Sequence, residues 1–219
     1  ALRWSKQRAR ILGRPAAAGK RRSPSEPSSR MRPFQSPRRV GRARRVGLHQ
    51  RSSAGTHGGG NTVVDTPVDV WDSVHDIDLR GAYLSSKFAI PKMSEAGGGA
   101  IVHISSILGL SGSDHGMAFQ SAKGGLISLT RHMAIAHAAE NIRVNCLCPV
   151  NIETPLTQAW LNDPITHDRV SSWNPMNRIG VPNEVAAAAA FLAAEEASFI
   201  TGAILPVDGG YLTMGRGSP

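Results

Sequence analysis

The sequence predicts an α/β fold in which helices pack against a mostly parallel sheet. Short β-branched segments alternate along the chain with longer segments of helical periodicity, which is the order expected of βαβ units. Of the 219 residues, 41% are hydrophobic and only 5% are aromatic. The core must therefore be mostly aliphatic and alanine-rich, which suits helices packed on a parallel sheet.

Ordered structure is expected from about Asn61 onwards. Thr66, Pro67 and Asp69 predict the start of a helix, with threonine as the N-cap, proline at the first position and an acid in the first turn. Apolar residues then recur at roughly helical spacing over residues 71–90, which predicts one long helix or two short ones before the glycines at 97–99.

The remaining segments continue the alternation. Residues 119–139 are rich in Ala, Gly and Ser, so we expect this helix to pack closely against another element. The other expected elements are strands at 100–105, 142–147 and 203–207, a capped turn at Thr154 and Pro155, and an Ala-rich helix from Pro182 to about Ala194.

The first 51 residues differ from the rest of the chain. They hold sixteen Lys and Arg residues and one acid, Glu26, whereas residues 52–219 hold nine basic and fifteen acidic residues. We expect residues 1–51 to be a basic, disordered segment, because they offer too little apolar surface to offset the entropy of ordering. The alternatives are a targeting segment, an arm that binds nucleic acid, or the product of a misassembled exon.

Two cysteines, Cys146 and Cys148, alternate on a predicted strand. We interpret them as buried thiols in a reducing compartment, which predicts a cytoplasmic protein, or an organellar one if residues 1–51 are a targeting segment. Further metal ligands are not found beside them, so no metal site is expected. No apolar run reaches about 18 residues, so no membrane-spanning helix is expected.

The pattern that carries chemistry lies around one lysine. Ser106 follows a predicted strand, and Phe119 lies thirteen residues further along the chain. Lys123 lies one helical turn after Phe119, on the same face of the predicted helix. This arrangement resembles the short-chain dehydrogenase/reductase family, whose signature is a serine followed by Tyr-x-x-x-Lys. The resemblance runs over about residues 52–214, so residues 52–219 are expected to form a partial catalytic domain. It implies a Rossmann-like, doubly wound parallel sheet that is N-terminally incomplete.

The resemblance also implies a site. Ser106 would hold the substrate oxygen, Lys123 would favour the phenolate of the tyrosine and bind the nicotinamide ribose, and Asp78 stands where the family has an asparagine. The positions matching the cofactor-binding residues of the family are Lys123, Pro149, Val150, Ile152 and Thr154. The implied cofactor is NAD or NADP, between which the sequence does not choose.

Three departures from the family pattern predict weak or absent turnover. Phe119 has no proton to give, and loss of a general acid costs about 10²–10⁴-fold in rate. His115, in the preceding loop, is a candidate substitute for the proton donor. Asp78 is nearly isosteric with asparagine but charged, which would disturb a proton relay. No glycine-rich, phosphate-binding turn after a strand is found in residues 1–51.

Three functions follow as hypotheses. The first is an NAD(P)-dependent oxidoreductase that acts on a small-molecule alcohol or carbonyl, with impaired activity. The second is a non-catalytic relative that acts by forming homo-oligomers, a dimer or tetramer, through the helix at 119–139 and the last strand. The third, which we consider the weakest, is nucleic-acid binding through residues 1–51. Trp160 and Trp173 hint at an apolar lid over the substrate, although simple packing explains them equally well.

Overall fold

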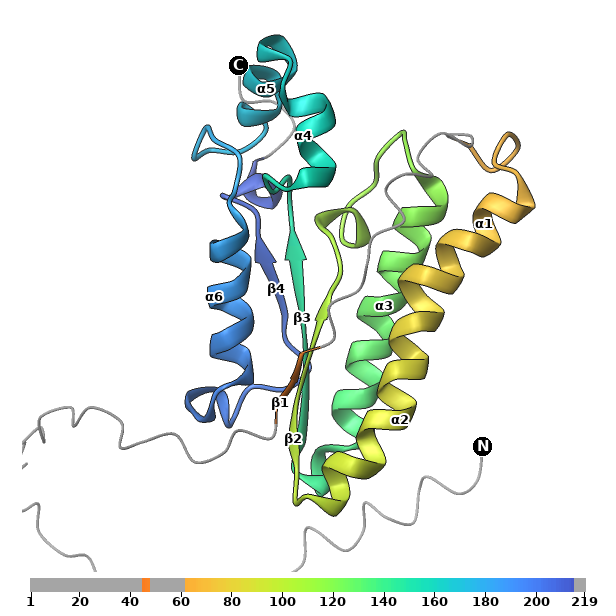
Figure 1. Ribbon diagram of the computed structural model, residues 1–219, viewed down its shortest axis with the longest axis vertical. Coiled ribbons are helices and arrows are strands. Elements are labelled where there is room, and N and C mark those ends of the chain that lie inside the picture. The colour runs from red at the N-terminus through yellow and green to blue at the C-terminus, as the bar shows by residue number, and fades with distance from the viewer. Residues whose placement is uncertain (1–44, 48–61, 215–219) are drawn as a thin grey trace, which may run out of the picture. The chain divides into compact units, whose positions relative to one another are not determined.

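The computed structural model describes residues 45–47 and 62–214, which form a four-stranded sheet with helices on both faces (Figure 1). The strands lie in the order β1-β2-β3-β4, and every neighbouring pair is parallel. Their bounds are β1 Arg45–Gly47, β2 Gly99–Ile104, β3 Ile142–Pro149 and β4 Ile204–Val207. The predicted parallel α/β sheet is confirmed. The basic segment lies outside the described residues, apart from the short strand β1.

Helices cover the two faces of the sheet unequally (Figure 1). On one face lie α1 (Val68–His75), α2 (Gly81–Glu95) and α3 (Met117–Ala136). The other face is covered by α6 (Pro182–Ala193), and the short helices α4 (Pro155–Leu161) and α5 (Pro164–Ser171) lie beyond the carboxyl end of β3. None of the helices among the described residues is long and apolar enough to cross a membrane.

The first predicted helix contains a π-helical turn. Residues Asp76–Arg80 join α1 to α2, and the N–H of Gly81 donates to the carbonyl of Asp76. The prediction of Thr66 as N-cap is wrong, because the helix begins at Val68 with Pro67 as its N-cap. The Thr66 hydroxyl instead donates to the carbonyl of Thr62 at 2.7 Å, so it closes the turn before the helix.

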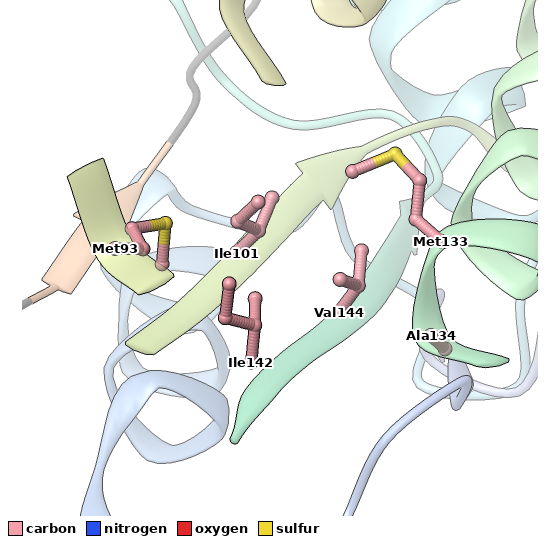
Figure 2. Packing of buried hydrophobic residues seen from close by; sticks show 6 residues of the cluster. All are labelled: Met93, Ile101, Met133, Ala134, Ile142 and Val144. Carbon is pink, nitrogen blue, oxygen red and sulfur yellow. The ribbon is translucent and has the colours of Figure 1, made fainter. Parts of the chain in front are cut away.

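A cluster of buried apolar side chains fixes β2 and β3 against the helices (Figure 2). Ile101 and Val144 lie opposite each other in the β2–β3 register and are fully buried. Around them pack Ile142 of β3, Met93 of α2, and Met133 and Ala134 of α3. This core holds the amino-terminal halves of the two central strands against the helices, and the candidate site lies at the opposite, carboxyl ends of the same strands.

Small residues on α3 allow the close packing that the sequence predicts. A Cβ atom at Gly125 would lie 2.9 Å from Cδ2 of Leu79, in the π-helical turn. A Cβ atom at Gly109, in the 3-10 turn Ile107–Gly109 after β2, would lie 2.9 Å from the backbone carbonyl oxygen of Lys123. Both contacts bring neighbouring elements close to Lys123.

Candidate active site

A buried pair of opposite charges lies at the centre of the candidate site. The Lys123 ammonium, from α3, lies 3.1 Å from Oδ1 of Asp78, in the π-helical turn, and both side chains are almost completely buried. The same ammonium donates to the backbone carbonyl of Ile104, at the end of β2, at 3.3 Å. Since an isolated buried charge is costly, Asp78 is the group that permits a charged lysine here.

Phe119 lies one turn before Lys123 on the same helix. The centroid of its ring is 5.3 Å from Nζ of Lys123, within the range of a cation–π contact. The ring is half-buried and packs against an apolar cluster with Val74, Ala118 and Ala122 at its centre. The structure therefore brings Asp78, Phe119 and Lys123 together, with an aromatic ring where the family pattern has a phenol.

Ser106 follows directly after β2, two residues beyond the carbonyl that Lys123 contacts. Its backbone is extended, and its Oγ accepts a hydrogen bond from the N–H of Leu108 at 3.2 Å, which caps a 3-10 turn. The preceding residue, Ser105, donates through its hydroxyl to the carbonyl of Lys123 at 2.9 Å. The Ser105 contact attaches the end of β2 to α3, so Ser106 and Lys123 both lie at the carboxyl edge of the sheet.

The end of β3 carries the residues expected at the nicotinamide. Pro149 ends the strand, and the N–H of Val150 donates to Val207 at 3.2 Å. Thr154 caps α4 in a reciprocal arrangement with Thr157, as the sequence predicts for Thr154 and Pro155. The half-buried Ile152 pairs with Gly180 through a parallel bridge, but its own N–H makes no hydrogen bond within the described residues.

This edge fits the nicotinamide end of a cofactor. Open α/β sheets bind ligands beyond the carboxyl ends of their strands. The N–H of Ile152 and the hydroxyl of Thr154 lie there and match the donor and acceptor chemistry of a carboxamide. An ammonium has three donors, and the two partners of Lys123 within residues 62–214 leave one for a ribose hydroxyl. The glycine-rich element that would hold the phosphates is not among the described residues.

The loop between Ser106 and Phe119 is held by a side chain that sequence reasoning missed. Gln120 accepts from the N–H of Ser113 at 3.0 Å and donates to the carbonyls of Ser113 and His115, at 3.1 and 2.6 Å. His115 itself is exposed and pairs with Asp114 at 3.0 Å. No contact with Lys123 or Phe119 brings His115 into the site, so its catalytic role stays a prediction. An amide has no chemical signature of its own, so Gln120 gave no signal.

Three further titratable groups lie buried beneath the site. His103 of β2 contacts Thr130 at 2.8 Å and Ser86 at 3.4 Å, and burial lowers its pKa to about 4. The predicted burial of Cys146 and Cys148 is confirmed, and both are free thiols. A hydrogen bond between the two thiols lowers the pKa of Cys146, and the positive charge of Lys123 lowers it slightly further. The same hydrogen bond and burial raise the pKa of Cys148.

Other candidate features have plain structural roles. His132 is exposed, and His137 pairs with Glu140 at 2.8 Å. No cluster of three or more metal-ligating side chains occurs within residues 45–47 and 62–214. Of the predicted lid, Leu161 is buried and Trp173 is 43% exposed, while the side chain of Trp160 is not described.

Comparison with known proteins identifies the family. The family described as enoyl-(acyl carrier protein) reductase matches residues 49–212. The chain belongs to the short-chain dehydrogenase/reductase family. It is 45% identical over 147 residues to cis-4-hydroxycyclohexanecarboxylate dehydrogenase of Sinomonas cyclohexanicum, which covers 67% of this chain but only 58% of that relative. The chain thus spans less than two thirds of the length of this relative.

The chain is also similar to an inactive relative and to a protein solved with a nicotinamide cofactor. The chain is 37% identical over 163 residues to the inactive 2-(S)-hydroxypropyl-CoM dehydrogenase 2 of Xanthobacter autotrophicus, covering 73% of this chain and 70% of that relative. It also resembles ElxO, solved with NADP bound and, as a tyrosine-to-phenylalanine variant, with NADPH bound. Both ElxO structures share 34% sequence identity and a TM-score of 0.68, covering 71% of this chain and 63% of theirs. These likenesses confirm the Rossmann-like fold.

Proposed function

We propose that this chain supplies the catalytic and nicotinamide-binding part of an NAD(P)-dependent oxidoreductase acting on an alcohol or carbonyl, with impaired turnover. The observation that carries the proposal is the meeting of Phe119, Lys123 and Asp78 at the carboxyl edge of the sheet. The open N–H of Ile152 and the position of Thr154 on the same edge support a nicotinamide ligand.

The proposed chemistry separates binding from proton transfer. The nicotinamide, when bound, supplies or accepts a hydride. The hydroxyl of Ser106 can hold the substrate oxygen and stabilise charge that develops on it. Lys123 can orient the ribose through its remaining donor. A proton must also reach or leave the oxygen, and the ring of Phe119 has none to exchange, so we expect turnover to be reduced by about 10²–10⁴-fold.

Cofactor binding should survive the missing phenol. The ElxO variant with a phenylalanine in place of a tyrosine holds NADPH, which supports binding without that hydroxyl in a protein of similar fold. In this chain the residues proposed to contact the nicotinamide, Ile152 and Thr154, lie between β3 and α4 rather than on the helix that carries Phe119. Binding and turnover are therefore expected to be separable here.

Calorimetric titration of the full chain with NADH and then NADPH tests the binding step. We expect binding of at least one of them in the micromolar range. Absence of binding at millimolar concentration, by a protein shown to be folded by circular dichroism, would mean that the family resemblance reflects ancestry alone.

Turnover is tested with Phe119→Tyr on a panel of secondary alcohols and ketones. We expect the variant to regain part of the lost rate. The matched control is Phe88→Tyr, which adds the same hydroxyl to an exposed ring on α2 and should change nothing. A Phe119→Tyr variant that binds cofactor and stays as inactive as the parent in ketone reduction, for which a neutral phenol is the proton donor, would contradict the proposal.

A non-catalytic role through self-association is the second candidate. A relative that is described as inactive belongs to the same family. Phe88 of α2 is 71% exposed and Ile135 of α3 is 82% exposed, so these helices present apolar side chains to solvent. Sedimentation of the full chain should then show a dimer or tetramer, and a monomer at all concentrations would argue against this role.

The remaining hypotheses stay predictions. Nucleic-acid binding depends on residues 1–51, and almost all of that segment lies outside the described residues. Salt-sensitive binding that is lost when residues 1–51 are deleted would support this hypothesis. Cytoplasmic or organellar location is likewise a prediction, and localisation of the full chain with and without the segment distinguishes the two.

A further inference from the structure

The carboxylate of Asp78 does more than replace an asparagine in shape. Its side chain is completely buried, and that of Lys123 is 4% exposed, so neither charge is screened by solvent. The π-helical turn carries Asp78 inward, whereas its neighbours Asp76 and Arg80 pair with each other on the surface at 3.1 Å. Of the two acids in this turn, Asp78 thus pairs with the buried ammonium of Lys123.

We propose that Asp78 is the permanent counter-ion of Lys123, filling the electrostatic role that a phenolate at position 119 would otherwise fill. This inference deepens the proposed function and rests on it. A cation within about 4–6 Å lowers the pKa of an acid by about 1–3, but a carboxylate at the same cation opposes that effect. The pair at this site is neutral, so it offers little net stabilisation to a second anion.

The other titratable groups near the pair do not restore the missing positive potential. Cys146, on β3, is close enough for Lys123 to contribute to its lowered pKa, and it adds no positive charge. His75, on α1, lies with Nδ1 2.9 Å from the Trp71 carbonyl and Nε2 3.3 Å from the Ser121 hydroxyl, outside the ion pair. Both ring nitrogens of His103 contact hydroxyls, those of Thr130 and Ser86.

Two substitutions, not one, therefore separate this chain from a site able to ionise a phenol. Phe119→Tyr provides the proton but leaves Lys123 neutralised. Adding Asp78→Asn removes the competing charge, while the amide oxygen can still accept a hydrogen bond from the ammonium. We expect the two substitutions to act together, because both act through the same lysine.

The test is a pH titration of phenolate absorbance in the full-length variants, after subtraction of the parent chain with its own two tyrosines. In Phe119→Tyr the pKa of the new phenol should stay at about 10 or above. In Phe119→Tyr with Asp78→Asn it should fall by about 1–3. Phe119→Tyr with Asp76→Asn is the matched control, since it removes an exposed acid from the same turn and should behave as the single variant.

Two results would overturn the proposal: a pKa below about 9 in Phe119→Tyr with Asp78 intact, or equal pKa values with and without Asp78 in folded proteins. If Asp78→Asn prevents folding, the single variant decides by its pKa alone. The titration needs neither cofactor nor turnover. Failure to bind NADH or NADPH would therefore count against the proposed function, whereas a low phenol pKa beside Asp78 would count only against this inference.

Discussion

The two ends of the sheet's core are fastened in different ways. Arg143, near the start of β3, donates to the backbone carbonyls of Leu192, Ala194 and Ile200, at 2.7, 3.0 and 3.3 Å, and so closes the end of α6. Two residues later, Asn145 donates to the same carbonyl of Ile200 at 2.9 Å. At the other end, the site region depends on one buried contact between full charges, Asp78 and Lys123.

This difference indicates at which end of the sheet a single substitution lowers the stability of the fold most. Around Arg143, several hydrogen bonds to neutral backbone groups share the task, so the loss of one leaves the others. At Lys123, removal of one partner leaves an uncompensated charge in the interior. The functional end of the sheet thus includes a buried pair of full charges beside its hydrogen bonds, and the following substitutions measure that contrast.

The largest effect is expected from breaking the buried pair. Asp78→Ala should lower the free energy of unfolding by about 3–5 kcal/mol, because the Lys123 ammonium loses its counter-ion. Asp76→Ala, which breaks an exposed ion pair in the same turn, should cost about 0.5 kcal/mol or less. Urea denaturation of both variants checks the prediction, and equal costs would remove the contrast.

A comparable effect should come from acid. Burial holds the pKa of His103 at about 4 in the folded state, against 6.5 for the ordinary value. Below pH 6.5 the unfolded chain takes up a proton that the folded chain refuses, so stability should fall as the pH drops towards 4, by about 3 kcal/mol in total. Denaturation across this range should show a slope that His103→Gln reduces and that His132→Gln, at an exposed position, leaves in place.

A smaller loss is expected at the opposite end of the sheet. Arg143→Met keeps the length of the side chain but removes its donors from three carbonyls, so we expect a cost of about 1–3 kcal/mol. The control is Arg131→Met on the exposed side of α3. If Arg143→Met proves more costly than Asp78→Ala, the buried ion pair is not the weaker point of the fold.

The smallest effect on stability should come from the exposed pair between Arg178 and Glu184. Hydrogen bonds from the Arg178 guanidinium, one of them 3.0 Å long, and from the N–H of Val181 lower the pKa of Glu184 to about 2. Arg178→Met should move this pKa back towards its ordinary value of 4.5 with little change in melting temperature. Carbon-detected NMR titration of the glutamate carboxyl measures the pKa directly.

Much of the fold was predictable because its signals are local. The β-branched runs at 100–105 and 142–147 identify the two central strands, which the structure places at Gly99–Ile104 and Ile142–Pro149. Thr154 and Pro155 identify the start of α4, because a cap and a proline act within one turn. The one-turn spacing of Phe119 and Lys123 places the Phe119 ring beside the Lys123 ammonium, as observed.

What the sequence did not reveal depends on contacts between distant residues. The pairing of Asp78 with Lys123 joins positions 45 residues apart, and no local pattern marks a carboxylate that turns inward. The hydrogen bonds from Gln120 to Ser113 and His115 depend on the path of the loop before α3, whose glycines set no unique conformation. The N-cap at Pro67 rather than Thr66 was missed because the Thr66 hydroxyl bonds to the carbonyl of Thr62 and not to the first turn of the helix.

The π-helical turn keeps a line of side chains in phase. Val74, Asp78, Ala82 and Ser86 are all buried, although they are spaced by four residues. In an α-helix of 3.6 residues per turn, each such step rotates by about 40° too far, and three steps drift by about a third of a turn. The wider turn at Asp76–Arg80 winds more slowly and cancels that drift. If this turn kept its length but took ordinary α-helical winding, the side chains before and after it would swing out of alignment.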